Sequence, residues 1–176
     1  MKKSIKNYEY TDDFESVDAI HEALKNKQYE DAVPHIVNLK KEIKKINFPH
    51  NKSTYSRHIL SKKDGYWLLL IEWDEDVSTC IHGHPEQSFV YLIDGSLEVK
   101  SFETEPLVLI DKKPLHVDEY IFHDQSNHSF DDKFDNGVHQ IHSKTRSLSL
   151  HFYSDDPSKG VVFEQNKKSE SGLYTL

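Results

Sequence analysis

Two histidines separated only by a glycine, His82 and His84, are the residues of this chain best suited to metal binding. In a β-strand, side chains two residues apart point to the same face, so both imidazoles would project to one side. Neutral imidazole nitrogens are good ligands for first-row transition metals. The pair alone is also compatible with a polar strand face, so a metal site needs support from elsewhere in the chain.

The spacing around this pair resembles the first motif of the cupin barrel, with Gly95 at the turn that follows. Cupins usually carry a glutamate ligand at the position that Ser88 occupies here, so the resemblance implies a site without its carboxylate. Glu86 is the nearest acid. We expect it to be solvated, with metal ligation by Glu86 as the lesser alternative.

A further ligand is expected from a later strand. Gly137-Val138-His139, with Ser143 beyond it, resembles the second cupin motif and implies His139 as the ligand. His142 has the opposite strand parity, so both histidines cannot face one metal ion. The fit with Gly137 favours His139.

A second set of polar residues alternates along one predicted strand. Ser149, His151 and Tyr153 share one face of the segment SLSLHFYS, and the residues between them are apolar. A wet strand face would account for this pattern. A hydroxyl, an imidazole and a phenol in register without any charge can also form a hydrogen-bond relay that orients the Tyr153 hydroxyl.

Together, four pieces of the sequence resemble the cysteine dioxygenase family, the thiol dioxygenases of the cupin superfamily. The pieces are Tyr55-Ser56-Arg57, Trp73 followed by His82 and His84, Gly137-Val138-His139, and Ser149 to Tyr153. They occur in the family's order between Tyr55 and Pro157, and four ordered pieces are far more specific than one. An N-terminal helical stretch is also usual in these proteins.

The resemblance implies a site for ferrous iron, Fe(II), and a set of surrounding roles. The iron ligands would be His82, His84 and His139. The relay outside the iron would be Ser149, His151 and Tyr153, with the Tyr153 hydroxyl reaching substrate and dioxygen. The substrate pocket would contain Arg57, which binds the substrate carboxylate, with Tyr55 beside it and with Trp73 and Ile141 in the wall.

Two positions depart from the family or stand apart from it. Animal members hold a cysteine in the Ser88 region that is joined to the relay tyrosine by a thioether. Here the serine and a loop shorter by one residue exclude that crosslink, and bacterial relatives also lack the cysteine. Cys80 shares strand parity with His82, but we expect it to be a small buried filler.

The resemblance implies an iron-dependent enzyme that oxidises L-cysteine to cysteine sulfinic acid with O2. Arg57 favours cysteine over 3-mercaptopropionate, because relatives acting on the latter usually carry glutamine there. Another small thiol, such as 3-mercaptopropionate or cysteamine, remains the nearest alternative substrate. A cupin that binds a metal without catalysis is the alternative from another class, and a cupin isomerase would more naturally keep the missing glutamate.

The elements that must position these residues change character near residue 50. Apolar residues recur at three- and four-residue steps from Asp13 to Ile46, which predicts helices, with Asp12 or Asp13 as a cap and Pro34 at the start of the second helix. Strands are predicted after Tyr55. Their segments are 65–73, 88–93, 96–101, 106–111, 116–122, 137–142, 147–154 and 160–165.

Asp94-Gly95 lies between two of these segments and predicts a type I′ hairpin. The whole pattern predicts a mainly β, cupin-type, jelly-roll-like barrel. Residues 1–50 would form a helical cover within the same domain and residues 51–176 the barrel. The polar stretch from His123 to Asn136 is expected to be a loop, and its role is open.

Most of the twelve histidines need no special function. We expect solvated or half-buried imidazoles at four positions in helical or linker segments, namely His21, His35, His50 and His58. We expect exposed imidazoles at three positions near or in the polar loop, namely His116, His123 and His128.

Composition limits the remaining possibilities. The 176 residues suit one domain, and 22 basic against 30 acidic residues leave a net charge of −8, unfavourable for binding nucleic acid or an anionic membrane. One cysteine excludes an intrachain disulfide, and no apolar run approaches about 18 residues. We therefore expect a cytoplasmic protein, compatible with a monomer, whose partners are a small thiol and O2.

Overall fold

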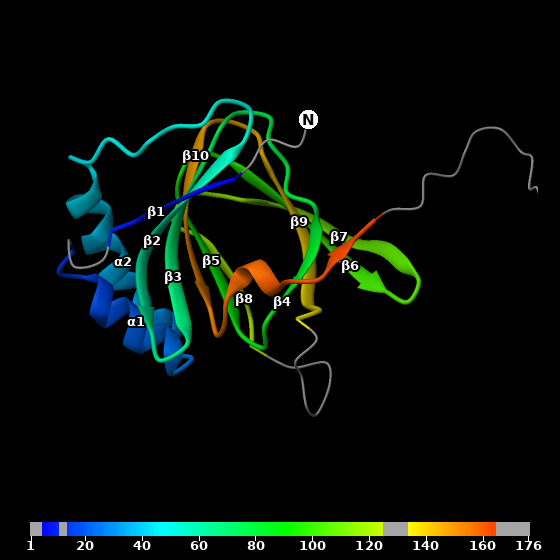
Figure 1. Ribbon diagram of the computed structural model, residues 1–176, viewed down its shortest axis with the longest axis horizontal. Coiled ribbons are helices and arrows are strands. Elements are labelled where there is room, and N and C mark those ends of the chain that lie inside the picture. Colours follow the sequence, from blue (N-terminus) through cyan, green and yellow to red (C-terminus); the bar gives the residue numbers. More distant parts are fainter. Residues whose placement is uncertain (1–4, 11–13, 125–133, 165–176) are drawn as a thin grey trace, which may run out of the picture.

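The computed structural model describes residues 5–10, 14–124 and 134–164. It consists of two facing β-sheets with two helices packed on the outer side of one of them (Figure 1). This confirms the predicted mainly β, jelly-roll-like barrel with a helical segment at its N-terminal end. No helix in the described part of the chain is long and apolar enough to cross a membrane.

The first sheet contains six strands, which are antiparallel except for the parallel pairing of β1 with β2. In spatial order they are β1 (Lys6–Glu9), β2 (Tyr55–Lys63), β3 (Tyr66–Trp73), β10 (Ser147–Tyr153), β5 (Ser88–Asp94) and β8 (Tyr120–His123). The five strands of the second sheet are β11 (Val162–Phe163), β4 (Ile81–His84), β9 (Asn136–Ser143), β6 (Leu97–Thr104) and β7 (Leu107–Leu115).

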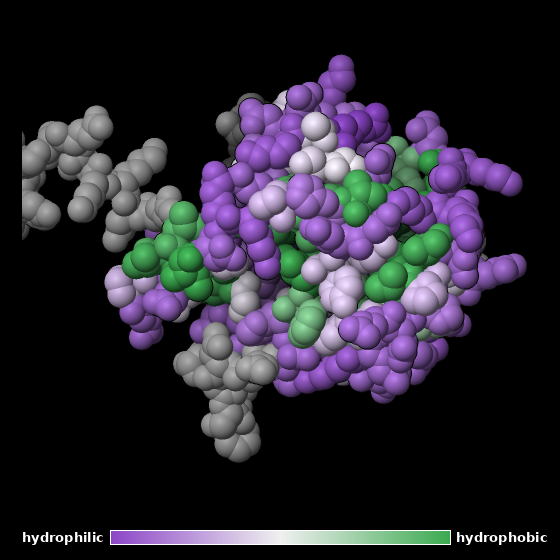
Figure 2. All heavy atoms as spheres, turned by 180° about the vertical axis from the view of Figure 1, so that it is seen from behind, coloured by the Kyte–Doolittle hydropathy of each residue, from purple (hydrophilic) through white to green (hydrophobic). Residues whose placement is uncertain are grey.

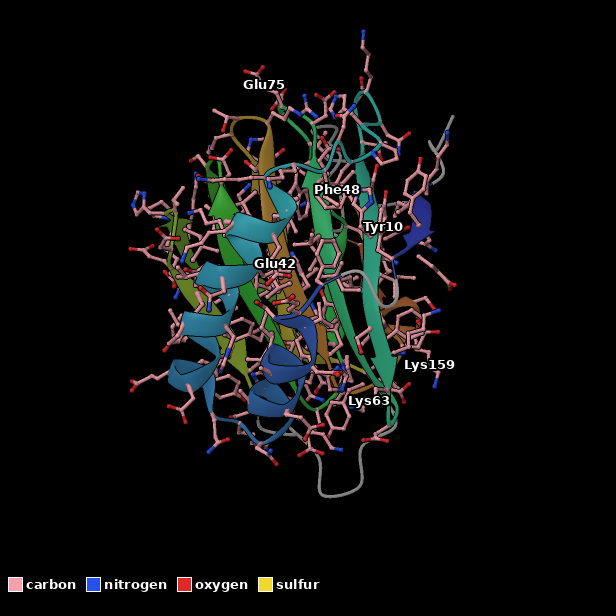
Figure 3. All side chains as sticks on the ribbon, turned by 90° about the vertical axis from the view of Figure 1, so that its left-hand side faces the viewer. Tyr10, Glu42, Phe48, Lys63, Glu75 and Lys159 are labelled. Atoms are coloured by element: carbon pink, nitrogen blue, oxygen red, sulfur yellow. The ribbon has the colours of Figure 1, made fainter. Side chains whose placement is uncertain are left out.

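The helices α1 (Val17–Lys25) and α2 (Tyr29–Ile43) lie across the outer face of the first sheet (Figure 3). Their apolar stripe, which the three- and four-residue spacing predicts, packs on the outward residues of β3, β5 and β10. A short 3-10 helix (Pro157–Lys159) follows β10. Because the helices seal only the outer face, the inner face is left for the polar site.

The predicted helix starts are wrong. The residue before α1 is Ser16, whereas Asp12 and Asp13 lie outside the described residues. The second helix begins at Tyr29, five residues before Pro34, which lies inside it. The Tyr29 ring stacks on Phe122 with centroids 4.1 Å apart, so tertiary packing rather than the proline determines where this helix begins.

The predicted hairpin at Asp94-Gly95 is also wrong. β5 pairs with β10 on one side and β8 on the other, so neither of its edges is open to β6. β6 instead crosses to the second sheet, where it pairs with β7 and β9. Gly95 has a φ of +89°, but Asp94 lacks the positive φ that a type I′ turn requires.

The other predicted strands are present with their ends shifted by up to four residues, although segment 160–165 is reduced to β11. β1 was not predicted, and β2 is not among the predicted segments, although it begins at Tyr55, where strands were expected to start. Most of the expected polar loop, residues 125–133, lies outside the described residues, and His123 and Asn136 at its two ends belong to β8 and β9. The hairpin of β6 and β7 projects from the barrel and exposes Val108, Leu109 and Ile110 (Figure 2).

Candidate metal centre

Three histidines meet inside the barrel because β4 and β9 are neighbours in the second sheet. His82 is the direct cross-strand partner of His139, and His84 lies one bulged step further along β4. Ring centroids are 4.7 Å apart for His82 and His84, 5.0 Å for His82 and His139, and 4.3 Å for His84 and His139. One ligand nitrogen from each ring lies within 4.8 Å of the others, so the three form a possible metal site.

The glycine between His82 and His84 is required by the packing around the strand. A Cβ atom on Gly83 would lie 2.5 Å from Asp135 Cα and 2.6 Å from Phe134 O. Any side chain there would push apart β4 and the segment leading into β9. Gly83, which separates His82 from His84 in the sequence, thus also allows β9, the strand that carries His139, to approach β4.

Hydrogen bonds to the backbone orient two of the three rings. His82 Nδ1 lies 2.9 Å from the carbonyl oxygen of Cys80, and His84 Nδ1 lies 3.2 Å from that of Asn136. A carbonyl only accepts, so each Nδ1 carries the proton and each Nε2 keeps its lone pair. His84 Nε2 is buried without a hydrogen-bond partner among the described residues, as expected of a ligand nitrogen.

The surroundings also keep these rings in the ligating form. Burial lowers the pKa of His82, and burial together with the neighbouring histidines lowers the pKa of His84 and His139 well below the usual value. Neutral imidazoles are the species that bind metal ions. The three nitrogens therefore fit a first-row transition metal, and the geometry does not select which one.

The predicted relay exists as a continuous chain of hydrogen bonds and has one additional member. Trp73 Nε1 donates to Ser149 Oγ at 2.8 Å, Ser149 Oγ is 2.7 Å from His151 Nε2, and His151 Nδ1 is 2.9 Å from Tyr153 Oη. Trp73, which we expected in the pocket wall, is fully buried and forms the far end of this chain. The near end reaches the metal site, because the Tyr153 ring stacks parallel to His84 at 5.7 Å.

The chemistry of its members gives this relay a direction. The Trp73 indole can only donate, so the satisfied arrangement has Ser149 accept from it and donate its own proton to His151 Nε2. Burial lowers the pKa of His151 to about 3, so the ring is neutral and its one proton is on Nδ1. His151 therefore donates to the Tyr153 oxygen, and the Tyr153 O–H is directed away from the relay.

Arg57, on the inner face of β2, is the cationic group of the site. Its guanidinium lies 5.9 Å from the Tyr55 ring centroid, and its charge contributes to the lowered pKa of His82 and His151. No carboxylate pairs with Arg57 among the residues that the structure describes. Burial raises the pKa of Tyr153, an effect that the Arg57 charge opposes, so the phenol is protonated near neutral pH.

Other expectations divide into confirmed and wrong ones. Glu86 is exposed, as expected, and ion-pairs loosely with Lys27. His142 faces outward and contacts Ser78, as its strand parity predicts. Cys80 is exposed rather than a buried filler.

Two expectations for the remaining histidines also fail. His21 and His58 are fully buried, not solvated: His21 lies between α1 and the first sheet, and His58 lies under β1 and the segment after α2. Their rings are accommodated by neighbouring aromatic side chains, as His21 is by Phe152 at 5.4 Å.

One residue near the site was missed. His123 was expected to be exposed, but it is half-buried at the end of β8 and lines the same cavity as Ser88 and His139. Nothing in the local sequence signals this, because it depends on β8 pairing with β5. His128 lies outside the described residues.

The comparisons with known proteins concern the fold alone. No family model and no curated protein matches the chain. Solved structures of similar shape include a cupin superfamily protein from Desulfitobacterium hafniense DCB-2, with 14% identity, a TM-score of 0.48, and coverage of 67% of this chain and 88% of that chain.

Two further solved structures resemble the chain to the same degree. KdgF from Halomonas sp. has 13% identity and a TM-score of 0.47, over 64% of this chain and 90% of that chain. A cupin 2 domain-containing protein from Halorhodospira halophila has 14% identity and a TM-score of 0.47, over 66% and 74%. These likenesses concern the arrangement of strands and assign no activity, ligand or partner.

Proposed function

We propose that this protein is an iron-dependent thiol dioxygenase that oxidises L-cysteine to cysteine sulfinic acid. The thiol R–SH gains both atoms of O2 and becomes R–SO2H, so no further reductant is required. The observation that supports this proposal is the convergence of three groups at one place. Three neutral histidines, a polarised tyrosine hydroxyl and a guanidinium that no described carboxylate pairs with surround the same interior space.

Arg57 would hold the far end of the substrate. Its planar guanidinium can bind a carboxylate through two parallel hydrogen bonds, which sets both the position and the orientation of a small amino acid. Tyr55 packs beside the guanidinium and limits its freedom. With the carboxylate held there, the thiol of cysteine would be directed toward His82, His84 and His139.

Ferrous iron bound by His82, His84 and His139 would supply a dipositive centre that favours thiolate over thiol and brings sulfur and dioxygen together. The residues around it have separate tasks. Tyr153 would donate its hydroxyl proton as a hydrogen bond to the reactants, because His151 already donates to its oxygen. The buried Trp73–Ser149 pair would keep His151 in the required tautomer.

The alternatives explain less of this arrangement. A non-catalytic metal-binding cupin accounts for the three histidines but not for a four-member relay that ends beside them. A thiol without a carboxylate, such as cysteamine, would leave Arg57 without a partner, whereas 3-mercaptopropionate would satisfy it. Because cysteine and 3-mercaptopropionate both carry a carboxylate, contact with Arg57 does not separate them. The preference for cysteine rests on the resemblance at this one position, and a single side chain seldom decides specificity.

The test combines metal analysis with oxygen uptake. Freshly purified protein is assayed for bound iron, and O2 consumption is then followed with L-cysteine, 3-mercaptopropionate and cysteamine. We expect iron and uptake of one O2 per cysteine, with the sulfinic acid identified by mass spectrometry. Iron binding without oxidation of any thiol would favour the non-catalytic alternative.

A further inference from the structure

The last strand of the second sheet, β7, has an open edge. It pairs with β6 on one side, and no strand in the described part of the chain pairs with its other side. Residues 108–114, seven in a row, are exposed. Successive side chains of a strand point to opposite faces, so both faces of β7 are accessible along this stretch. An open edge of this kind can accept another strand.

The exposed stretch begins with three large apolar residues. Val108, Leu109 and Ile110 are 47%, 47% and 56% exposed. Figure 2 shows apolar atoms gathered on the hairpin of β6 and β7, which projects from the rest of the molecule. A single exposed apolar residue such as Val37 on α2 is ordinary. A contiguous run of them on an open strand edge indicates a surface that another molecule covers.

The rest of β7 restricts where a second strand can add. Lys112, Lys113 and Pro114 follow the apolar run, and the ladder with β6 has a bulge at Ile110. Lysine, proline and bulges blunt a strand edge against pairing. The part of the edge that can pair is therefore short, residues 107–110, and the contact made through it is small.

The charges on either side of this segment are of opposite sign. Glu103 and Glu105 lie at the tip of the hairpin. Lys112 and Lys113 lie toward its base. Glu105 and Lys113 are exposed, and neither has an ion-pair partner among the described residues. Two such hairpins in parallel would bring like charges together, whereas an antiparallel arrangement brings the acidic tip of each to the basic base of the other.

We propose that β7 is the interface of a homodimer, in which residues 107–110 pair with the same residues of a second copy in antiparallel orientation. A two-fold axis through the middle of this segment gives a closed contact, because each copy uses the same surface. The second sheet then continues from one protomer into the other, and the apolar side chains of the two copies pack together. This interface does not depend on the proposed thiol chemistry and is tested apart from it.

The experiment measures self-association of the full chain by sedimentation velocity. The contact is smaller than a standard interface, so we expect a reversible monomer–dimer equilibrium within roughly 5–500 µM rather than a permanent dimer. Hydrogen exchange read by mass spectrometry should be slower in residues 107–110 at the higher concentrations, because hydrogen bonds between the two strands protect these amides.

Leu109→Lys places a charge at the centre of the contact. The substitution occurs twice in the dimer, so we expect association to weaken by about tenfold or more. Val37→Lys is the matched control and should leave association unchanged, because Val37 is also an exposed apolar residue but lies on α2. Thermal unfolding and metal content, measured for every variant, should not change, since both residues are exposed.

Charge reversal tests the orientation of the two strands. Glu105→Lys and Lys113→Glu should each weaken association by about two- to tenfold, the range for two exposed ion pairs. The double variant should restore it, because each copy again offers opposite charges at tip and base. Within one chain these residues are far apart, since Glu105 lies at the tip and Lys113 pairs with Val99.

The possible results separate the dimer from its alternatives. A monomer at every concentration, or association that survives Leu109→Lys, would overturn the interface. Species larger than a dimer would overturn the two-fold arrangement. Failure of the double variant to restore association would overturn the antiparallel pairing. None of these results bears on oxidation of thiols, which is measured separately by O2 uptake.

Discussion

Histidines are buried on both faces of the first sheet, in two different surroundings. On the inner face, His151 has a hydrogen-bond partner at each ring nitrogen, Ser149 on one side and Tyr153 on the other. On the outer face, His58 lies between β1 and the segment after α2, and neither of its nitrogens has a partner among the described residues. Its ring instead packs on Phe48 at 4.8 Å, one of the aromatic residues labelled in Figure 3.

Burial alone therefore does not identify a functional histidine. Burial lowers the pKa of both His58 and His151, so both rings are neutral near pH 7. The difference lies in what surrounds the nitrogens. Polar neighbours fix the tautomer of His151 and orient Tyr153 beside the metal site. His58 instead packs against aromatic rings, stacked on Tyr8 and tilted against Phe48.

The largest expected effect tests the inner face directly. His139→Ala removes one of the three proposed metal ligands, so we expect bound iron to be lost. Thiol-dependent O2 uptake should fall by more than about 100-fold, because even a residue that only hydrogen-bonds to a metal ligand can cost up to about 100-fold when it is mutated. Metal analysis and an oxygen electrode measure both quantities. His142→Ala, on the outward side of the same strand, should change neither, and retention of iron in His139→Ala would contradict the assigned ligand set.

Arg57→Ala should come next in size. Removing a charge-assisted bidentate contact of roughly 1.5–3 kcal/mol predicts an increase of about 10- to 100-fold in KM for L-cysteine, with iron content unchanged. Steady-state O2 uptake at varied cysteine gives the value. Cysteamine, which has no carboxylate, is the matched substrate control and should show little change. An unchanged KM for cysteine would show that Arg57 does not bind its carboxylate.

Tyr153→Phe should have a smaller effect, on kcat rather than on iron binding. The variant removes the hydroxyl at the end of the relay but keeps the ring that stacks on His84, so we expect kcat to fall by about tenfold or more. Trp73→Phe, at the far end, should produce a weaker fall of the same kind. If the two variants lowered iron content instead, the relay would be supporting the metal ligands rather than the reaction.

The smallest effect concerns the outer face and is seen in stability. Burial lowers the pKa of His58 in the folded chain below its unfolded value of about 6.5, so the unfolded chain takes up the proton first as the pH falls. Stability therefore declines below about pH 6.5.

His58→Phe should remove this contribution, at most about 1.4 kcal/mol per pH unit, and leave thiol oxidation unchanged. Urea unfolding at about pH 7.5 and about pH 5.5 measures the difference. His116→Gln, at an exposed site, is the control. An equally steep pH dependence in His58→Phe would show that other groups cause it, and loss of activity would remove the contrast between the two faces.

Much of the fold and of the site could be predicted from local patterns. Period-two alternation identified β10 and the shared face of Ser149, His151 and Tyr153, because strand geometry fixes side-chain direction. The same parity placed His142 outside the site. The helical spacing predicted α1 and α2, since each needs one apolar stripe to pack on the sheet.

Features that depend on which strands become neighbours could not be predicted. Asp94-Gly95 has the composition of a hairpin turn, yet β5 already has partners on both edges and the chain must cross to the other sheet. Pro34 has the composition of a helix start, but the stacking of Tyr29 on Phe122 sets it earlier. Likewise His58 is buried only because β1 and the segment around Phe48 fold over it.

The sequence by itself determined which residues can do chemistry and which of them share a strand face, because both follow from residue type and the two-residue repeat of a strand. The tertiary structure alone decided that His139 pairs with His82, that Trp73 completes the relay and that His123 lines the cavity. Those relations join segments far apart in the chain. They arise only when sheet order and register are set by the packing of the whole barrel.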